Sequence, residues 1–473
     1  MRRLLSRCFT LDLRSLAAAR ICLSLVLLAD LLIRLTVLED FHTDSGFMPR
    51  AELVQFKYVP SSICLHLFSG ATWLMAVLFL FHIACVVALG LGYRTQLATA
   101  LCWLMGNSLQ TRNPFILDSG DRLLMLILMW GFFCDWGDFY SLDARKKGVP
   151  RETRVCHVGT AGFVLQMVYL YWFSVFYKWH PVWFSEGTAI YIALNLELFC
   201  RPLAKSVLPF WDLMKTSTHL AVFTEAVGPL LILTGQKWLR FLGVLLLSVL
   251  HLGIFALMSI GVFALVSLTY LVAFIPGFVW DKFQKGQVDK VAVPESSERS
   301  FWKEFTAAIL LTLVTWWNVN RAFSVPMPLP VFNLCHALKV DQYWNLFAPV
   351  PRTLDCWFVL YGVTESGKEL DLWMPEAKPL SWEKPESVEA TFRCHRDRVF
   401  GTALEYVLEE GGRQSYLSVK ARQYNEKHPD DPVVHLKFYR VEQLTALGYK
   451  YVKPEPVMLF ERTVKDIDGS RSL

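Results

Sequence analysis

The stretch SLAAARICLSLVLLADLLIRL, residues 15–35, is the first of several long apolar segments, and it decides the class of fold. It follows a short basic N-terminus, as the apolar core of a signal peptide does. The apolar run is longer than such a core, it contains Arg20 and Asp30, and no convincing cleavage site follows it. We therefore interpret it as a first membrane helix, over residues 15–37.

The composition of the whole chain agrees with a membrane protein. The 473 residues are 54% hydrophobic and 19% charged, whereas ordinary soluble domains are about 45–50% apolar and roughly 25% charged. The net charge of +5 is modest, and no basic block indicates nucleic acid binding. The eleven cysteines are scattered without a metal-ligand spacing, so they are interpreted as small buried residues and no metal is expected.

Nine segments are predicted to form membrane helices, since about 20 mostly apolar residues cross a bilayer. They cover residues 15–37, 68–92, 95–112, 121–137, 157–178, 216–235, 238–257, 259–279 and 304–320. Basic residues gather before the first segment and in every second connection, notably in 138–156 and 280–303. The positive-inside rule then predicts a cytoplasmic N-terminus and a C-terminal region on the non-cytoplasmic side.

Residues 325–473 differ from the rest because their apolar runs are shorter and their charge is higher. Apolar and polar residues alternate in CWFVLYGV, SYLSVKARQY and VVHLKFYRV, and Ser366-Gly367 is typical of a turn between strands. We predict two domains. Residues 1–324 form a helical transmembrane domain, and residues 325–473 form a β-rich extramembrane domain large enough for its own core.

Lys178 ends the fifth segment, within YLYWFSVFYKWHPVWFSEGTA, residues 169–189. On a helix, Ser174 and Tyr171 lie four and seven residues before it on the same face. A lysine partly removed from water gives up its proton more readily and can act as a general base. The alternative interpretation is a snorkelling lysine in an aromatic belt at the membrane interface.

Other ionisable residues at membrane depth are also candidate functional groups. His251 and His82 can hydrogen-bond, move protons or join two helices. Glu225 is predicted to pair with a lysine or arginine of another helix. Asp118 and Asp121, in the polar loop GNSLQTRNPFILDSGDRLL, suggest either a cation site or salt bridges with nearby arginines.

Five stretches give the chain a resemblance to a known family. The chain resembles the HTTM family of membrane proteins, which includes the vitamin K-dependent γ-glutamyl carboxylases, over about residues 10–360. The stretches are SLAAARICLSLVLLADLLIRL with FHTDSGFMPR, RNPFILDSGDRLL, FYKWHPVWFSEGTAIYIAL, LHLGIFALMSIGVF and LKVDQYWNLFAPVPR.

This resemblance implies a helix bundle around a pocket for reduced vitamin K or a related hydroquinone. Lys178 matches the family lysine that deprotonates the hydroquinone, and His251 falls on a family histidine. Tyr171, Ser174, His82 and Asp121 are the expected cofactor-binding residues. The implied reaction is carboxylation of glutamate, in a secreted protein, coupled to quinone epoxidation.

The chain also departs from the carboxylase pattern. The paired lysines followed by Leu-Asp are replaced by Tyr177-Lys178-Trp179-His180, and Gly120-Asp121 stands where the carboxylases have Asn-His. The resemblance to bacterial-type members implies an inner-membrane location, with lipids as neighbours. The alternative function is a non-carboxylating scaffold, or a lipid-binding or transport protein, with Glu225, Asp118 and Asp121 along a path.

Overall fold

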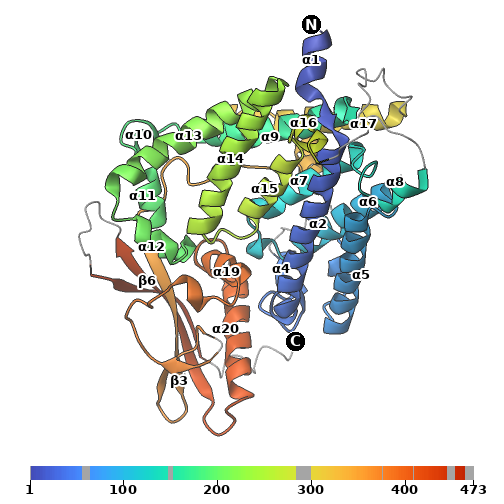
Figure 1. The fold of residues 1–473 in the computed structure, drawn as a ribbon. Helices are drawn as coiled ribbons and strands as arrows, with labels where there is room; N and C mark the ends of the chain where they lie inside the picture. The colour runs from blue at the N-terminus through green and yellow to red at the C-terminus, as the bar shows by residue number, and fades with distance from the viewer. Residues whose placement is uncertain are drawn as a thin grey trace.

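The structure is a computed structural model of the chain, and Figure 1 draws its fold. It describes residues 2–55, 64–147, 153–283, 300–374, 376–408, 410–444 and 453–463. Parts of the two basic connections, residues 148–152 and 284–299, lie outside the described residues. A helical bundle carries the N-terminus at one end, and a sheet with its own helices lies at the other (Figure 1).

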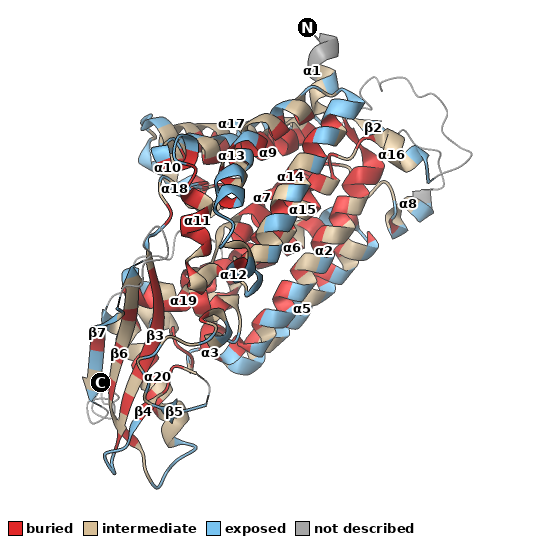
Figure 2. Cartoon of the chain, turned by 60° about the vertical axis from the view of Figure 1, so that its left-hand side comes forward, coloured by how far each residue is buried: buried red, intermediate tan, exposed pale blue. Residues whose placement is uncertain are grey.

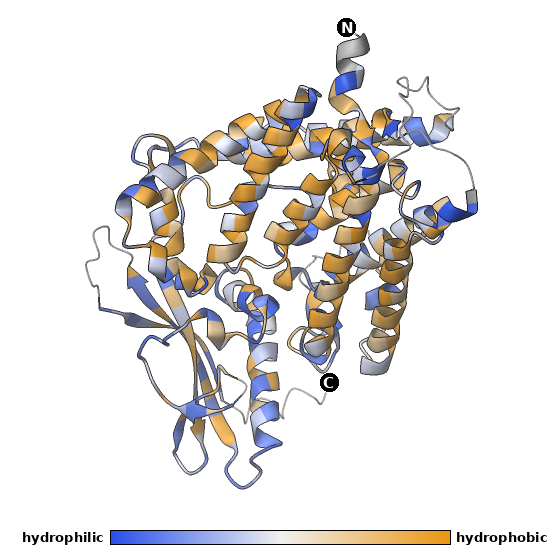
Figure 3. Ribbon diagram, in the orientation of Figure 1, coloured by the Kyte–Doolittle hydropathy of each residue, from blue (hydrophilic) through white to orange (hydrophobic). Residues whose placement is uncertain are grey.

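Five helices are long and apolar enough to cross a membrane, by length and composition. They are α2 (Leu13–Thr36), α5 (Thr72–Leu91), α9 (Val158–Tyr177), α13 (Trp211–Leu233) and α14 (Lys237–Leu257). Figure 3 shows mostly apolar residues along α2, α5, α13 and α14, in contrast to the more hydrophilic C-terminal helix α20. Several apolar helices of this length indicate a membrane protein.

The other four predicted segments are also helical. They correspond to α6 (Thr95–Arg112), α7 (Ser119–Phe133), α15 (Phe263–Val272) and α17 (Phe301–Phe323). α7 has 15 residues and α15 has 10, which is short of the roughly 20 residues of a spanning helix. α6 contains a run of buried polar residues near its end. The positions of all nine helices are confirmed, but nine membrane crossings are not.

Short helices connect or flank these elements. They are α1 (Arg2–Phe9), α3 (Leu38–His42), α4 (Arg50–Gln55), η1 (Leu65–Leu67), η2 (Pro114–Ile116), α8 (Leu142–Lys147), α10 (Pro181–Phe184), α11 (Ala189–Leu194), η3 (Glu197–Phe199), α12 (Leu203–Val207), α16 (Gly277–Asp281) and α18 (Leu329–Ala337). A two-stranded ribbon, β1 (Leu11–Asp12) and β2 (Arg154–Val155), joins the N-terminus to the start of α9.

Small residues let the central helices approach closely. A Cβ added at Gly243 of α14 would lie 2.7 Å from the backbone oxygen of Gly228 in α13. One added at Gly162 of α9 would lie 2.2 Å from the ring of Trp130 in α7. Close packing of this kind is how membrane helices associate, because lipid provides no hydrophobic force between them. It brings α14 against α13, and α9 against α7.

The C-terminal region contains a five-stranded antiparallel sheet in the order β5-β4-β3-β6-β7. Its strands are β3 (Leu354–Thr364), β4 (Glu369–Asp371), β5 (Lys378–Pro379), β6 (Val433–Leu444) and β7 (Glu455–Thr463). The predicted turn at Ser366-Gly367 joins β3 to β4, and Gly367 has φ +83, which favours glycine. The β-sheet prediction is confirmed for CWFVLYGV and VVHLKFYRV.

The prediction of strand character in SYLSVKARQY is wrong. These residues belong to α20 (Glu410–Asn425), which follows η4 (Glu389–Thr391) and α19 (His395–Tyr406). Buried residues of α20 include Gly412, Tyr416 and Val419, which share one face at helical spacing. The apolar residues of so short a segment fit both the two-residue spacing of a strand and the spacing of a helix, and packing against the sheet decides between them.

The sheet region shares a core with two loops of the helical bundle. Phe41 and Phe47, after α2, pack with Phe400 of α19 and Tyr416 of α20. The buried faces of the sheet and of these helices meet in Figure 2. In contrast, Trp344 packs into the core of the membrane helices. The junction between the two regions is therefore an extensive packed interface.

Candidate functional site

Helix α9 ends at the lysine that the sequence singles out. The backbone N–H of Lys178 donates to the carbonyls of Ser174 and Val175 and closes the last turn. A cation is favourable at this position, because the carbonyl end of a helix carries partial negative charge. His180 then caps α10, and Pro181 is the first residue of that helix.

The side chain of Lys178 turns inward and is buried, with 4% of its surface exposed. Its Nζ donates to Ser174 Oγ at 2.9 Å and to both carboxylate oxygens of Glu225 at 2.6 Å. Ser174 also donates to Glu225, at 3.2 Å, and the ring of Trp183 lies 4.9 Å from Nζ. A buried, paired amine does not fit a snorkelling lysine, whose charged end stays in water.

Another buried hydrogen bond, made by Tyr171, joins α9 to α14. Tyr171 OH and His251 Nε2 are 2.8 Å apart, and both residues are buried. His251 Nδ1 is buried without a hydrogen-bond partner. When Nε2 accepts from the tyrosine hydroxyl, Nδ1 carries the proton and remains an unsatisfied donor. The edge of Phe263 packs against this ring, with centroids 5.7 Å apart.

We define the amine cluster as Tyr171, Ser174, Lys178, Glu225 and His251. Three helices contribute to it, because α9, α13 and α14 pack together. It unites both predicted catalytic residues and two of the predicted cofactor-binding residues. The predicted ion pair of Glu225 with a basic residue outside its own helix is also found, and its partner is Lys178.

The amine cluster has the parts needed for proton transfer. All three hydrogens of a Lys178 ammonium have acceptors, and an ammonium has no lone pair with which to accept a proton. Transfer of one proton from Nζ to Glu225 leaves a neutral amine and a neutral carboxylic acid. In an environment of low dielectric constant, loss of both charges removes their desolvation penalty. The neutral amine is then a proton acceptor.

Asp121 belongs to a different buried cluster. Its carboxylate accepts from Arg34 at 2.6 Å and from Arg396 Nη2 at 2.9 Å. Asp30 pairs with the same two arginines, at 2.8 and 2.7 Å. We name Asp30, Arg34, Asp121 and Arg396 the docking network. Since Arg396 lies in the first turn of α19 and the others lie in α2 and α7, this network fixes the C-terminal region to the bundle.

His82 of α5 also lies apart from the amine cluster. It is buried, and neither ring nitrogen has a hydrogen-bond partner. The Cys102 carbonyl is near the ring but outside hydrogen-bonding geometry. Its charged neighbours are Arg34 and Asp30. Among the described contacts, none joins His82 or Asp121 to Lys178, so the geometry does not place these two in one site with the amine.

The polar loop after α6 has structural partners. Asp118 caps α7 by accepting from the backbone of Gly120 and Asp121. Arg112 donates to the carbonyls of Met48 and Thr43, and Arg122 pairs with Asp341. The predicted salt bridges of Asp121 therefore form with Arg34 and Arg396, which lie outside the loop. Asp118 lies 3.9 Å from His395 Nε2 and forms no ion pair with an arginine of the described residues. Within the described ranges, no group of three or more His, Cys, Asp or Glu is placed to hold a metal ion.

Trp183, Arg34 and Arg396 were not predicted from the sequence as partners of the candidate residues. Arg34 could have been predicted as a partner of Asp30, since it follows Asp30 by four residues within an apolar helix. Arg396 could not have been predicted as a partner of Asp121, because the two residues lie 275 positions apart in the sequence. The chain was compared with family models, curated proteins and solved structures, and none matches it.

Proposed function

We propose that the protein is a membrane enzyme in which the amine cluster accepts a proton from a bound hydroxyl compound. The observation that carries this proposal is the buried contact of Lys178 with Glu225 and Ser174. A buried ion pair contributes little net stability, because desolvation offsets its attraction. A buried pair that can exchange a proton internally is a natural component of acid–base catalysis.

Each residue of the cluster has a role in this proposal. Glu225 takes a proton from Lys178, and the amine then accepts a proton from the bound hydroxyl. Ser174 holds the amine by its 2.9 Å hydrogen bond. Tyr171 orients His251, whose Nδ1 is directed to the bound molecule as a donor. The surrounding helices exclude water, so the proton is not exchanged with solvent.

The residues fit a hydroquinone of the vitamin K type. The unsatisfied Nδ1 of His251 matches an oxygen of such a molecule, and Phe263 and Trp183 offer apolar surface beside the polar groups. Bound there, the hydroquinone would supply an acidic phenolic hydroxyl and two-electron reducing power. The expected roles of His82 and Asp121 in binding it have no support from their positions.

The wider proposal follows the HTTM resemblance. It comprises hydroquinone-dependent carboxylation of glutamate in a secreted protein, with quinone epoxidation, in a bacterial inner membrane. It also comprises nine membrane crossings, a cytoplasmic N-terminus and a non-cytoplasmic C-terminal region. The basic residues in alternate connections support this orientation. For the transport alternative, the contacts of Asp118 and Asp121 give no support, since both serve structural interactions.

The test uses the full chain purified in detergent with a glutamate-containing peptide and added reduced vitamin K. Wild-type protein is expected to incorporate labelled carbon dioxide. Lys178→Ala should lower the rate by about 10²–10⁴-fold, the range for loss of a general base. Lys215→Ala, which changes an exposed lysine of α13, is the matched control and should keep the wild-type rate.

Two results would contradict the proposal. Full activity of folded Lys178→Ala would remove the lysine from the reaction. Wild-type protein that contains no quinone in its extracted lipids and takes up no added hydroquinone would remove the cofactor. Thermal unfolding of each variant shows whether a lost rate reflects lost structure.

A further inference from the structure

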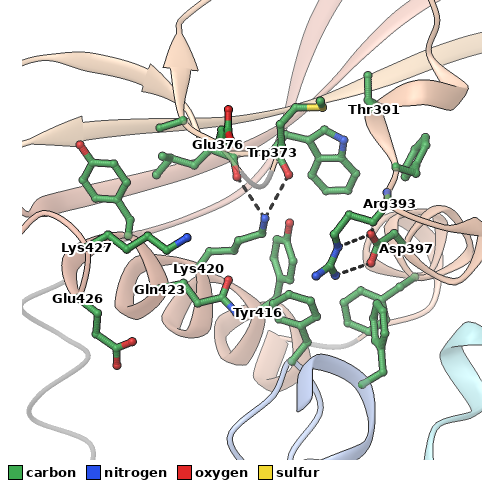
Figure 4. A pocket seen from close by; sticks show the side chains of 18 of the residues that line it. Trp373, Glu376, Thr391, Arg393, Asp397, Tyr416, Lys420, Gln423, Glu426 and Lys427 are labelled. Atoms are coloured by element: carbon green, nitrogen blue, oxygen red, sulfur yellow. Dashed lines mark hydrogen bonds and ion pairs between the residues drawn. The ribbon is translucent and has the colours of Figure 1, made fainter. Parts of the chain in front are cut away.

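A cavity of about 620 Å³ lies where α20 and α19 meet the sheet and the loop after α2. Figure 4 shows its side chains converging from these elements. None of the residues that line the cavity belongs to the amine cluster. Pockets of about 300–1,000 Å³ are of the size that binds small organic molecules.

The inner wall of this cavity is aromatic. Trp373 and Tyr416 line it with centroids 6.4 Å apart, and Phe47 packs 5.0 Å from Tyr416. Phe392 lies 5.7 Å from Trp373 and also lines the cavity. Such rigid surfaces bind flat apolar molecules with little loss of side-chain freedom. The body of a suitable ligand is therefore flat and apolar.

Most of the charged groups in the wall are already paired. Arg393 donates to both oxygens of Asp397, at 2.6 and 2.7 Å, and also pairs with Asp40. Gln423 donates to the other oxygen of Asp40 at 3.0 Å. Asp371, below the wall, accepts backbone hydrogen bonds from Leu360 and Trp373. These groups leave few unused polar atoms for a ligand.

Lys420 of α20 is the exception in this wall. Its Nζ donates to the carbonyls of Leu372 and Trp373, at 3.2 and 3.1 Å, and lies 5.9 Å from the centre of the Tyr416 ring. An ammonium has three hydrogens, so one remains for another acceptor. No carboxylate of the described chain forms an ion pair with it. Figure 4 shows the amine in the middle of the cavity.

The electrostatic setting of Lys420 agrees with a missing counterion. Burial, with a contribution from Arg393, lowers the pKa of Lys420 to about 8. The carboxylates of Asp397, Asp40 and Asp371 act in the opposite direction but do not reach contact distance. The other charged residues of the lining, Glu376, Glu426 and Lys427, are exposed, as is the titratable His428.

We propose that this cavity binds a small carboxylate with a flat apolar body. The carboxylate accepts the third hydrogen of Lys420, and the body packs against Trp373 and Tyr416. A contact ion pair in a partly buried site is stronger than one at the surface, because water screens it less. The ligand thereby supplies the counterion that none of the described residues provides.

The experiment is calorimetric titration of the detergent-purified full chain with indole-3-propionate as the probe. Indole-3-propionamide has the same body without the charge and is the matched ligand. At pH 7 the acid should bind at least about tenfold more tightly than the amide, as expected for a charge-assisted hydrogen bond. Lys420→Met should abolish this difference, whereas Lys437→Met, at a half-buried position of β6 outside the cavity lining, should preserve it.

The pH dependence gives a second measurement. The free amine loses its proton as the pH rises through about 8, so affinity for the acid should fall above that pH. Binding of the amide should not change. Lys420→Arg keeps its charge throughout this range, so its preference for the acid should persist without the fall above pH 8.

Three outcomes would overturn the proposal. Equal affinity for acid and amide would assign the cavity to apolar molecules alone. An unchanged preference for the acid in Lys420→Met would place the binding elsewhere. Absence of binding at millimolar probe would contradict a site of this chemistry. Should Lys420→Met fail to fold, the pH profile of Lys420→Arg decides between the outcomes.

Discussion

The two buried charge clusters of this molecule, the amine cluster and the docking network, differ in what their residues can do. The docking network pairs two aspartates with two arginines in four salt bridges. The amine cluster has a single ion pair beside a tyrosine–histidine hydrogen bond. Both are sealed from water, so burial alone does not distinguish a functional site from a structural one.

The chemistry of the cations separates the two clusters. A guanidinium keeps its proton in proteins and binds carboxylates through a fixed fork of donors. Arg34 and Arg396 can therefore hold the two carboxylates in place but cannot exchange protons with them. Lys178 and Glu225 can exchange one. An amine–carboxylate pair therefore suits proton transfer, whereas arginine–carboxylate pairs suit the assembly of the two regions.

The largest expected effect tests the assembly role of the docking network. Arg396→Met leaves two buried carboxylates facing Arg34 alone, and loss of one partner from a buried pair typically costs about 3–5 kcal/mol. We expect a lower unfolding temperature and faster proteolysis before α19. Lys437→Met is the control for the loss of one positive charge. A change in the free energy of unfolding below about 1 kcal/mol would contradict the role of this network.

Loss of the charge of Glu225 is expected to cost less stability than loss of Arg396. Glu225→Gln should lower the free energy of unfolding by about 2–3 kcal/mol, because the Lys178 ammonium keeps a hydrogen-bond acceptor but loses its counterion. The double variant Lys178→Met/Glu225→Gln removes both charges and should recover most of this stability. Neither Glu225→Gln nor the double variant should incorporate carbon dioxide. Activity recovered together with stability would contradict proton transfer at this pair.

A smaller effect is expected at the tyrosine–histidine contact. Tyr171→Phe removes the 2.8 Å hydrogen bond and leaves both nitrogens of His251 unsatisfied. Such a buried group costs about 1–3 kcal/mol. The double variant Tyr171→Phe/His251→Phe also removes the unsatisfied nitrogens. The difference in the free energy of unfolding between the single and double variants gives the cost of burying these nitrogens without a partner. Unfolding of single and double variants in denaturant measures both free energies.

The smallest change in the free energy of unfolding is expected for an ion pair that is partly exposed to water. Lys437 and Glu461 pair across β6 and β7 at 3.4 Å, with 32% and 48% of their side chains exposed. Glu461→Gln should change the free energy of unfolding by less than about 1 kcal/mol, since water and salt screen exposed pairs. The change should shrink further at high salt. A loss as large as that of Arg396→Met would remove the distinction between buried and exposed pairs.

Local patterns in the sequence predicted much of the fold. Apolar runs of about 20 residues located the long helices, because the period and length of such runs act within one element. The spacing of Tyr171, Ser174 and Lys178 placed them on one face of α9 for the same reason. The hairpin at Gly367 followed from a turn residue with positive φ. These features depend on residues close together in the chain.

Tertiary structure decided the partners of those residues. Glu225 reaches Lys178 from 47 residues away, and Arg396 reaches Asp121 from 275 residues away. It also decided that residues 415–424 form a helix against the sheet, and that Lys420 stands in a cavity where no described carboxylate pairs with it. Pairing across the chain depends on how whole elements pack, and no local pattern encodes it. The sequence determined that Lys178 ends an apolar helix, and packing of α13 against α9 made it a buried, paired amine.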